Sequence, residues 1–436
     1  MDALILWLYG AAGAGKSAIA HSLAEICEKY GYLLATFFFW RTAPMRSDIS
    51  RFVATIAYQI ARTIPASRSH IEAAVDADPM IFHQSVDVQL AKLIIEPLRC
   101  LHSTGFDFKY SPFVIILDGL DECHGTDIQS GLVKSLAAAF KHFPLRIRIL
   151  IASRPEVYLQ STFNSSSIQA DVSRLALSDE YSSDEDIYRF LNDSFDEIRH
   201  EHPLASCIPS SWPSTDVLRE LTRKSSGQFI FASTTIKYIG GDPHQLPHHR
   251  LDIIRRLQPP KGEKDMPYAE LNSLYRHVLS NVNDIEAVKE VLGILLVVNP
   301  LLFSIRQIRS IDDWLFWKPG ETKACLSQLA SVIGYDVNRH ISILHASLSD
   351  FLLDPFRSCR FYLCRESVLG DSVALGLRHM HQHVLNRKGD ISALSEVDQS
   401  SADTQHVLFQ IASITAASSY PASLPAQSIP LDFNRN

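Results

Sequence analysis

The apolar and polar positions of the chain follow different periods in its different parts. In the first 178 residues, short and almost wholly apolar runs alternate with segments whose apolar residues recur at helical spacing. The runs are typical of strands covered on both faces of a parallel sheet. They lie at 2–9, 33–40, 112–117, 146–152 and 168–177. The helical segments are 18–30, 48–63, 85–102 and 128–142. This alternation predicts an α/β domain with a parallel five-stranded sheet.

Beyond residue 178 only helical spacing remains for about a hundred residues. Acidic residues from Asp179 to Asp186 open a helix that runs to about His200, because negative charge is favoured at a helix N-terminus. Further helices are expected at 215–224, 228–238, 250–257 and 268–282. This part of the chain is predicted to be all helical.

A third pattern follows. We expect three helices at 285–298, 303–308 and 324–333. A small hairpin of 334–337 with 340–344 follows them, and a last helix lies at 346–353. Three helices with a β-wing form the winged-helix pattern, which often binds DNA. The last helix has no Arg, Lys or Asn face before Arg357, so DNA reading has little support.

The first apolar run ends in a glycine-rich loop. Residues 10–17, Gly-Ala-Ala-Gly-Ala-Gly-Lys-Ser, fit G-x-x-x-x-G-K-[ST]. Such a loop turns backbone N–H groups toward one anion, the lysine reaches the outer phosphates and the serine ligates Mg²⁺. The residues predicted to hold the phosphates are Gly10, Gly13, Ala14, Gly15, Lys16 and Ser17. A short match also occurs in ordinary turns, but the strand before it and the helix after it favour a nucleoside triphosphate site.

The third apolar run ends in a group of acids, Asp118-Gly-Leu-Asp-Glu122. Carboxyl ends of parallel strands lie beside the phosphate loop, so Asp118 is predicted to hold Mg²⁺ together with Ser17. Asp121 and Glu122 are the catalytic candidates that orient or deprotonate an attacking water, and their spacing does not distinguish them. The alternative is a capped helix start, with Asp121 or Asp127 as N-cap.

The fourth run is followed by Ser153-Arg154-Pro155. Because its strand ends on the same edge as Asp118, Arg154 is placed to contact the γ-phosphate and report its presence. The alternative is a surface arginine that pairs with Glu156.

Taken in order, the loop 10–17, the acids 118–122 and Ala-Ser-Arg-Pro at 152–155 resemble the motifs of NACHT-domain proteins. Segments 55–60 and 227–232 resemble the versions found in large fungal NACHT families. The resemblance covers about 4–353 and implies a STAND-class, NLR-like switch, with slow NTP hydrolysis and homo-oligomerisation on activation. It also implies a role in fungal innate recognition or cell-death signalling. The effector and repeat modules of such proteins are not recognisable in this sequence.

In that family, a winged-helix histidine contacts the phosphates of bound ADP. The segment from Leu344 to Phe351 resembles the Met-His-Asp segment of the plant receptors and places His345 on the histidine, whereas Ala346 replaces the aspartate. The alternative for His345 is a histidine that caps or packs at a helix start.

The patterns and the resemblance together predict four parts. They are 1–178, a NACHT P-loop nucleotide-binding domain; 179–283, a helical domain; 284–356, a winged-helix domain; and 357–436, a helical fragment with a Ser/Ala-rich tail. The last part is either a linker or the start of a C-terminal region.

The composition of the chain limits the partners and the compartment that we expect. The chain has 41 Lys+Arg against 48 Asp+Glu, a net charge of −7, which gives no general attraction to nucleic acid or an anionic membrane. Seven cysteines are scattered without C-x-x-C spacing, so a cytoplasmic location is expected. The longest apolar stretch, 291–303, contains Asn299-Pro300 and is shorter than the ~20 residues of a membrane span.

The sequence therefore favours an ATP/ADP-dependent switch that uses Mg²⁺. A guanine-specifying [NT]-K-x-D is absent from the P-loop region, and ATP is preferred on family grounds while GTP stays open. Two other functions stay open as well. One is a P-loop ATPase or kinase with high turnover, and the other is a nucleotide-binding scaffold that does not hydrolyse.

Overall fold

The computed structural model of the 436-residue chain describes most of its residues. They are 3–41, 46–108, 112–177, 183–260, 262–263, 266, 268–298, 310–335 and 341–388. The chain divides into two compact units. The first unit is Met1–Val278 with Leu329–Asp350, and the second unit is Leu279–Gln328 with Phe351–Asn436. The predicted helix 303–308 lies outside the described residues, as does the tail beyond residue 388.

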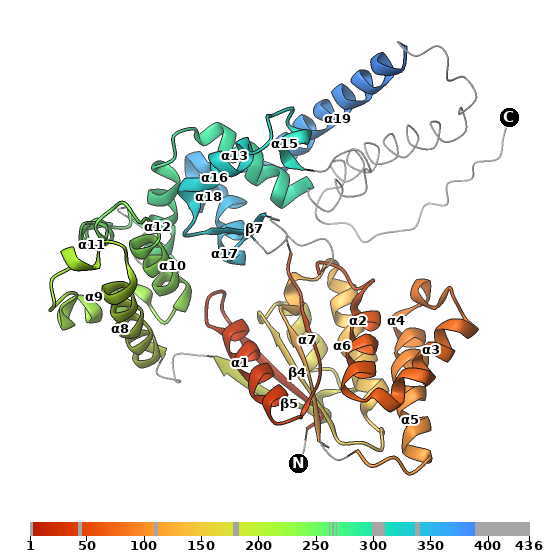
Figure 1. Ribbon diagram of the computed structural model, residues 1–436. Coiled ribbons are helices and arrows are strands. Elements are labelled where there is room, and N and C mark those ends of the chain that lie inside the picture. Colours follow the sequence, from red (N-terminus) through yellow and green to blue (C-terminus); the bar gives the residue numbers. More distant parts are fainter. Residues whose placement is uncertain are drawn as a thin grey trace. The chain divides into compact units, whose positions relative to one another are not determined.

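The first unit contains the predicted parallel sheet (Figure 1). Its strands are β1 (Ile5–Gly10), β2 (Leu33–Phe38), β3 (Phe113–Asp118), β4 (Ile147–Ser153) and β5 (Val172–Leu177). Their order is β2-β3-β4-β1-β5, and every pair is parallel. The α/β prediction is therefore confirmed. The carboxyl ends of β1, β3 and β4 meet at one edge, which brings their following loops together.

Alternate residues of the strands face opposite sides of the sheet. On one side, Leu8, Ile116 and Leu150 pack against Ala20 and Ala24 of α1 (Lys16–Lys29). The other side is the larger core, in which Trp7, Ile115 and Ile149 pack under several helices (Figure 1). These helices include α2 (Phe52–Thr63), α6 (Thr126–Phe140) and α7 (Val157–Phe163). Burial on both faces explains why the strands are almost wholly apolar.

The predicted helix 85–102 is present in three pieces: α4 (Val86–Leu90), a π-helical turn (Ala91–Ile95) and α5 (Glu96–Ser103). The structure adds helices that the pattern does not predict, namely α3 (Arg68–Ala77), α7 and α15 (Ile311–Trp314). Helix α3 buries only Ile71, so it lacks the apolar stripe by which a helix is recognised.

The helical part of the first unit agrees with the predicted helices to within a few residues. It contains α8 (Ser183–Glu201), α9 (Thr215–Ser225), α10 (Phe229–Gly240), α11 (Pro247–Arg256) and α12 (Ala269–Ser280). Short 3₁₀ turns connect the longer elements: Pro65–Ser67, Ile81–His83, Leu120–Glu122, Gln169–Asp171 and Ala205–Cys207 in the first unit, with Ser327–Leu329 and Cys359–Phe361 elsewhere.

The expected small hairpin is also present. Strands β6 (Ile333–Tyr335) and β7 (Ile341–Ile343) pair antiparallel, and α17 (Ala346–Leu352) follows. The predicted helix 324–333 is wrong at its end, because α16 (Glu321–Leu326) stops early and Ile333 begins β6. The boundary between the units runs through the predicted winged-helix region. The winged helix and the four domain boundaries stay predictions.

The second unit is helical where it is described. It contains α13 (Ile285–Gly293), a π-helical turn (Ile294–Val298), α15, α16, α18 (Pro355–Ser358) and α19 (Arg365–Lys388). Its core joins Ile294, Val298 and Trp314 to Val368 and Leu375 of α19. Among the residues that the structure describes, no helix is long and apolar enough to cross a membrane.

Candidate nucleotide site

The glycine-rich loop connects β1 to α1 at the carboxyl edge of the sheet. Gly13 and Gly15 have φ of +81° and +89°, a region that favours glycine because a Cβ is strained there. Gly15 precedes α1, and no side chain caps the first turn of this helix. Its leading N–H groups are therefore not taken by a side-chain acceptor, as an anion site at a helix start requires.

Lys16 lies across this loop. Its Nζ donates to the carbonyl oxygens of Gly10 (2.9 Å) and Ala11 (2.8 Å). Burial lowers the pKa of Lys16, while the carboxylates of Asp121 and Asp118 act in the opposite direction. The ammonium group therefore stands over the loop with neutral partners that a phosphate oxygen can replace.

Asp118 ends β3 and is 5% exposed. Burial raises its pKa, and the nearby Ser17 hydroxyl and Lys16 ammonium partly offset this rise. Its Oδ1 is buried and accepts no hydrogen bond from the residues that the structure describes. A buried carboxylate oxygen without a donor fits a cation ligand. The pair of Asp118 and Ser17 is thus suited to hold Mg²⁺ together with phosphate oxygens.

Asp121 is bound tightly by Arg154. Its Oδ1 accepts the Arg154 main-chain N–H (3.0 Å), and its Oδ2 pairs with Arg154 Nε (3.2 Å). Burial alone would lower the pKa of Arg154, but the carboxylates of Asp350 and Asp121 outweigh it and raise that pKa. Helix α6 begins after Gly125, without a side-chain cap. The cap alternative for Asp121 and Asp127 is therefore not what the structure contains.

Glu122 has a different environment. Its Oε2 accepts the main-chain N–H of Arg41 (3.0 Å). Burial raises its pKa from 4.5 to about 7, which the Arg41 N–H bond only partly opposes. Glu122 thus changes charge near neutral pH.

Two residues of the site, Arg41 and Asp350, are not singled out by sequence reasoning. Asp350, on α17, accepts from Arg154 NH1 through Oδ2 (2.6 Å) and from Arg41 NH1 through Oδ1 (3.3 Å). Arg154 is 18% exposed and pairs with Asp121 and Asp350 rather than with Glu156. The signal for Arg41 is its position just past β2, at the edge where Arg154 also lies. Asp350 has no comparable local signal.

His345 lies at the start of α17. Its Nδ1 accepts the Ser347 N–H (3.0 Å), so the proton of the neutral ring is on Nε2. Burial lowers the pKa of His345 to about 4, and the positive charges of Arg154 and Lys16 contribute. Ser347 is also hydrogen-bonded to Tyr275 of α12 (2.8 Å). His345 therefore caps a helix, as its alternative predicts, and also lies within electrostatic reach of the phosphate loop.

Helix α10 packs directly on the phosphate loop. A Cβ built on Gly13 would lie 2.3 Å from Ile230 Cγ2, and one on Gly15 would lie 3.7 Å from Phe229 Cδ2. Both residues belong to the segment 227–232, whose role the sequence does not show. The loop is therefore held between the sheet and the first turn of α10.

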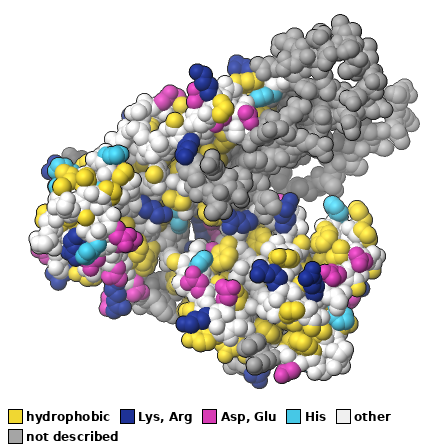
Figure 2. All heavy atoms as spheres, viewed as in Figure 1, with side chains coloured by type: hydrophobic (Ala, Val, Ile, Leu, Met, Phe, Trp, Pro, Cys, Tyr) yellow, Lys and Arg dark blue, Asp and Glu magenta, His cyan; other side chains and the backbone are white. Residues whose placement is uncertain are grey.

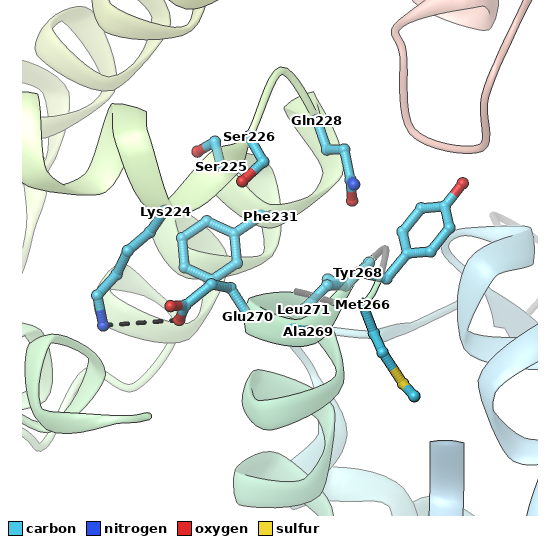
Figure 3. Close-up of a pocket in the computed structure, with 10 residues that line it drawn as sticks. All are labelled: Lys224, Ser225, Ser226, Gln228, Phe231, Met266, Tyr268, Ala269, Glu270 and Leu271. Atoms are coloured by element: carbon cyan, nitrogen blue, oxygen red, sulfur yellow. Dashed lines mark ion pairs between the residues drawn. The ribbon is translucent and has the colours of Figure 1, made fainter. Parts of the chain in front are cut away.

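A pocket of about 310 Å³ opens beside α10 (Figure 3). It lies between the end of α9, the start of α10 and the start of α12, and contains none of the predicted site residues. Its charged side chains pair with each other, Lys224 Nζ with Glu270 Oε2 at 3.7 Å. Lys224 also donates to the carbonyl of Leu257 (2.8 Å) past the end of α11. These contacts give Lys224 a structural role.

One family model matches the part of the chain that contains most of this site. The family described as Nephrocystin 3, N-terminal, matches residues 2–154, which contain the phosphate loop, Asp118, Asp121, Glu122 and Arg154. No curated protein matches the chain. Two solved structures are similar over most of it. A chain of Drosophila ORC, bound to DNA, is 12% identical over 77% of this chain and 78% of that one, with a TM-score of 0.34. Cdc6p from Pyrobaculum aerophilum is 13% identical over 78% of this chain and 83% of that one, with a TM-score of 0.33. Similarities this weak carry no information about function.

The sheet order, the phosphate loop and the acid at the end of β3 define a P-loop NTPase-like domain. The family match covers about a third of the chain. Residues 2–154 are therefore similar to the family described as Nephrocystin 3, N-terminal.

Proposed function

We propose that this protein is an ATP/ADP-dependent switch in which the bound nucleotide controls the arrangement of the segment that follows β7. The observation that carries the proposal is the position of His345 and Asp350. Both come from residues far from the phosphate loop in sequence, and both interact electrostatically with Arg154. A ligand whose contacts differ between two arrangements of such a segment shifts their populations.

The same contacts support a rest state with a diphosphate. His345 Nε2 carries the proton of a neutral ring, and a neutral donor can face a phosphate oxygen without changing the net charge of the site. Arg154 pairs with Asp121 through Nε and with Asp350 through NH1 in this arrangement. Because these Arg154 donors are already taken by carboxylates, fewer of them are available to bind a third phosphate.

Slow hydrolysis is part of the proposal. Glu122, with a pKa of about 7, is suited to accept a proton from water, because a general base works best near the operating pH. Asp121 instead positions Arg154 through two contacts. Mg²⁺, when held by Asp118, Ser17 and the phosphates, supplies neutralisation of phosphate charge.

Self-association on exchange of ADP for ATP completes the proposal, and it rests on the resemblance to NACHT proteins. Nucleic acid is not proposed as a general partner. Figure 2 shows basic and acidic side chains interspersed over the visible face, in keeping with the net charge of −7. Non-specific binding to nucleic acid depends on clustered positive charge.

The test is nucleotide binding and turnover by purified full-length protein. Lys16→Ala is expected to abolish binding of ADP and ATP, because Lys16 is the cation over the loop. Glu122→Gln and, separately, the double variant Asp121→Ala/Glu122→Ala are expected to retain binding and lose turnover. Unchanged affinity in Lys16→Ala would show that the nucleotide binds elsewhere.

The same measurements separate the other two functions. Turnover on the order of 1–100 s⁻¹ with a phosphorylated acceptor would indicate a kinase. Tightly bound ADP with no phosphate release would indicate a scaffold that does not hydrolyse.

A further inference from the structure

Two arginines flank the strand that ends in the predicted metal ligand. In the sheet order β2-β3-β4, β3 ends at Asp118, Arg41 follows β2 on one side, and Arg154 follows β4 on the other. Both arginines are therefore at the carboxyl edge where a parallel sheet binds its ligand. Only Arg154 is expected there from the sequence motifs.

The main chain of each arginine is held by one of the acids that follow β3. The main-chain N–H of Arg41 is held by Glu122 (3.0 Å), and that of Arg154 by Asp121 (3.0 Å). Asp121 also pairs with Arg154 Nε (3.2 Å). The NH1 group of Arg154 therefore has a different acceptor. The two NH1 groups meet on one acceptor, the carboxylate of Asp350.

The geometry of this acceptor is that of an anion in a two-arginine clamp. One oxygen of Asp350 faces Arg154 NH1 at 2.6 Å, and the other faces Arg41 NH1 at 3.3 Å. The Asp350 side chain is 23% exposed, and it is the partner contributed by a separate segment, 309 positions from Arg41. Arginine forks suit the planar or tetrahedral oxygens of a carboxylate or a phosphate equally well.

We propose that Arg41 and Arg154 form a binding site for the terminal phosphate of a nucleoside triphosphate, and that Asp350 occupies this site when that phosphate is absent. The proposal rests on the proposed nucleotide function and adds Arg41 and Asp350 to it. The phosphate and the Asp350 carboxylate compete for the same donors, so binding of a triphosphate releases α17 from the arginines. ADP, which lacks that phosphate, leaves the Asp350 contacts in place.

The experiment measures the dissociation constants of ADP and of a non-hydrolysable ATP analogue for the full-length chain with Mg²⁺. Asp350→Asn keeps the shape of the side chain and removes its charge. It is expected to tighten binding of the analogue by about tenfold, the size of an ordinary coupling between sites, with little change for ADP. Arg41→Gln is expected to weaken the analogue by a similar factor, again with ADP unchanged, and to leave the main-chain bond to Glu122 intact.

Asp171→Asn is the matched control. Asp171 pairs with Lys141 (2.7 Å) in the same unit, so its replacement removes one negative charge without touching the two arginines. Its ratio of analogue to ADP affinity is expected to equal that of the wild type. Melting temperatures of all variants show that they are folded.

The outcomes separate the two proposals. Absence of any nucleotide binding by the wild type would refute the switch itself. If ADP binds normally and Asp350→Asn has the same ratio of analogue to ADP affinity as Asp171→Asn, only the two-arginine site is refuted. Orthophosphate added without nucleotide is a second probe. If it binds to Asp350→Asn and the ATP analogue does not displace it, the site takes a free phosphate and its assignment to the nucleotide is overturned.

Discussion

Glu122 illustrates at the scale of one residue how burial changes chemistry without changing sequence. Its carboxyl group has one main-chain donor, from Arg41, and little water, so its ionised form is poorly stabilised. Its neighbour Asp121 contacts Arg154 twice, once at the main-chain N–H and once at the guanidinium Nε. Two adjacent acids thus have different tasks, and only the partners that each meets in the fold separate them.

The pKa of Glu122 predicts a pH-dependent effect of Glu122→Gln. Below pH 4.5 the acid is protonated in the folded and the unfolded protein, and the variant has no advantage. Between 4.5 and about 7 the unfolded chain loses the proton while the folded chain keeps it, so wild-type stability falls relative to the neutral variant as pH rises. Above about 7 the difference is constant.

We expect a gain of about 2–3 kcal/mol for Glu122→Gln at pH 7.5 and none at pH 4, from the size of the shift. Urea unfolding of both proteins across this range measures it. A gain of the same size at both pH values would contradict a buried acid with a raised pKa.

At the scale of elements, the contact between the phosphate loop and α10 depends on the absence of a side chain at Gly13. Gly13→Ala would place a methyl group 2.3 Å from Ile230 Cγ2 in a residue with φ of +81°. We expect a loss of about 1–3 kcal/mol in the free energy of unfolding, from strain and displacement of α10 together. Thermal or denaturant unfolding measures it.

Gly131 offers a matched control for this change. It lies inside α6, and a Cβ there would have no neighbour within 4 Å. Gly131→Ala is expected to stabilise the protein by about 0.5–1 kcal/mol, because alanine is the better helix former. If Gly13→Ala proved as stable as Gly131→Ala, α10 would not pack on the loop in solution.

At the scale of the whole molecule, the proposed switch predicts a change of mass. The protein is expected to stay in its resting form with ADP and to form larger assemblies with a non-hydrolysable ATP analogue, since the analogue removes Asp350 from the arginines. Light scattering on a sizing column measures this for wild type and Lys16→Ala. A mass that does not respond to either nucleotide in the wild type would argue for the scaffold.

Much of the fold follows from local sequence alone. In the runs 2–9, 112–117 and 146–152, the described residues that the sheet buries are apolar, and these runs contain most of β1, β3 and β4. The phosphate loop is a contiguous motif whose glycines adopt the positive φ that its chemistry needs. Such features are determined by neighbours in the chain, so a pattern within ten residues is sufficient to predict them.

The missed elements have a common cause. Helix α3 buries a single isoleucine, and the π-helical turn at Ala91–Ile95 changes backbone hydrogen bonding without changing the apolar pattern. Neither leaves a periodic signal. Their presence depends on packing against the rest of the core, which overrides weak local preference.

The sequence by itself determined the parallel sheet, the phosphate loop and the acid at the end of β3. Only the tertiary structure decided which charges meet there. Arg41, Arg154 and Asp350 are separated by up to 309 positions. Arg154 is expected at the site from its motif, whereas Arg41 and Asp350 are not singled out by the sequence. The energy of their contact comes from burial in one place, which no local pattern records. Asp350 is therefore visible as part of the site only after the chain has folded.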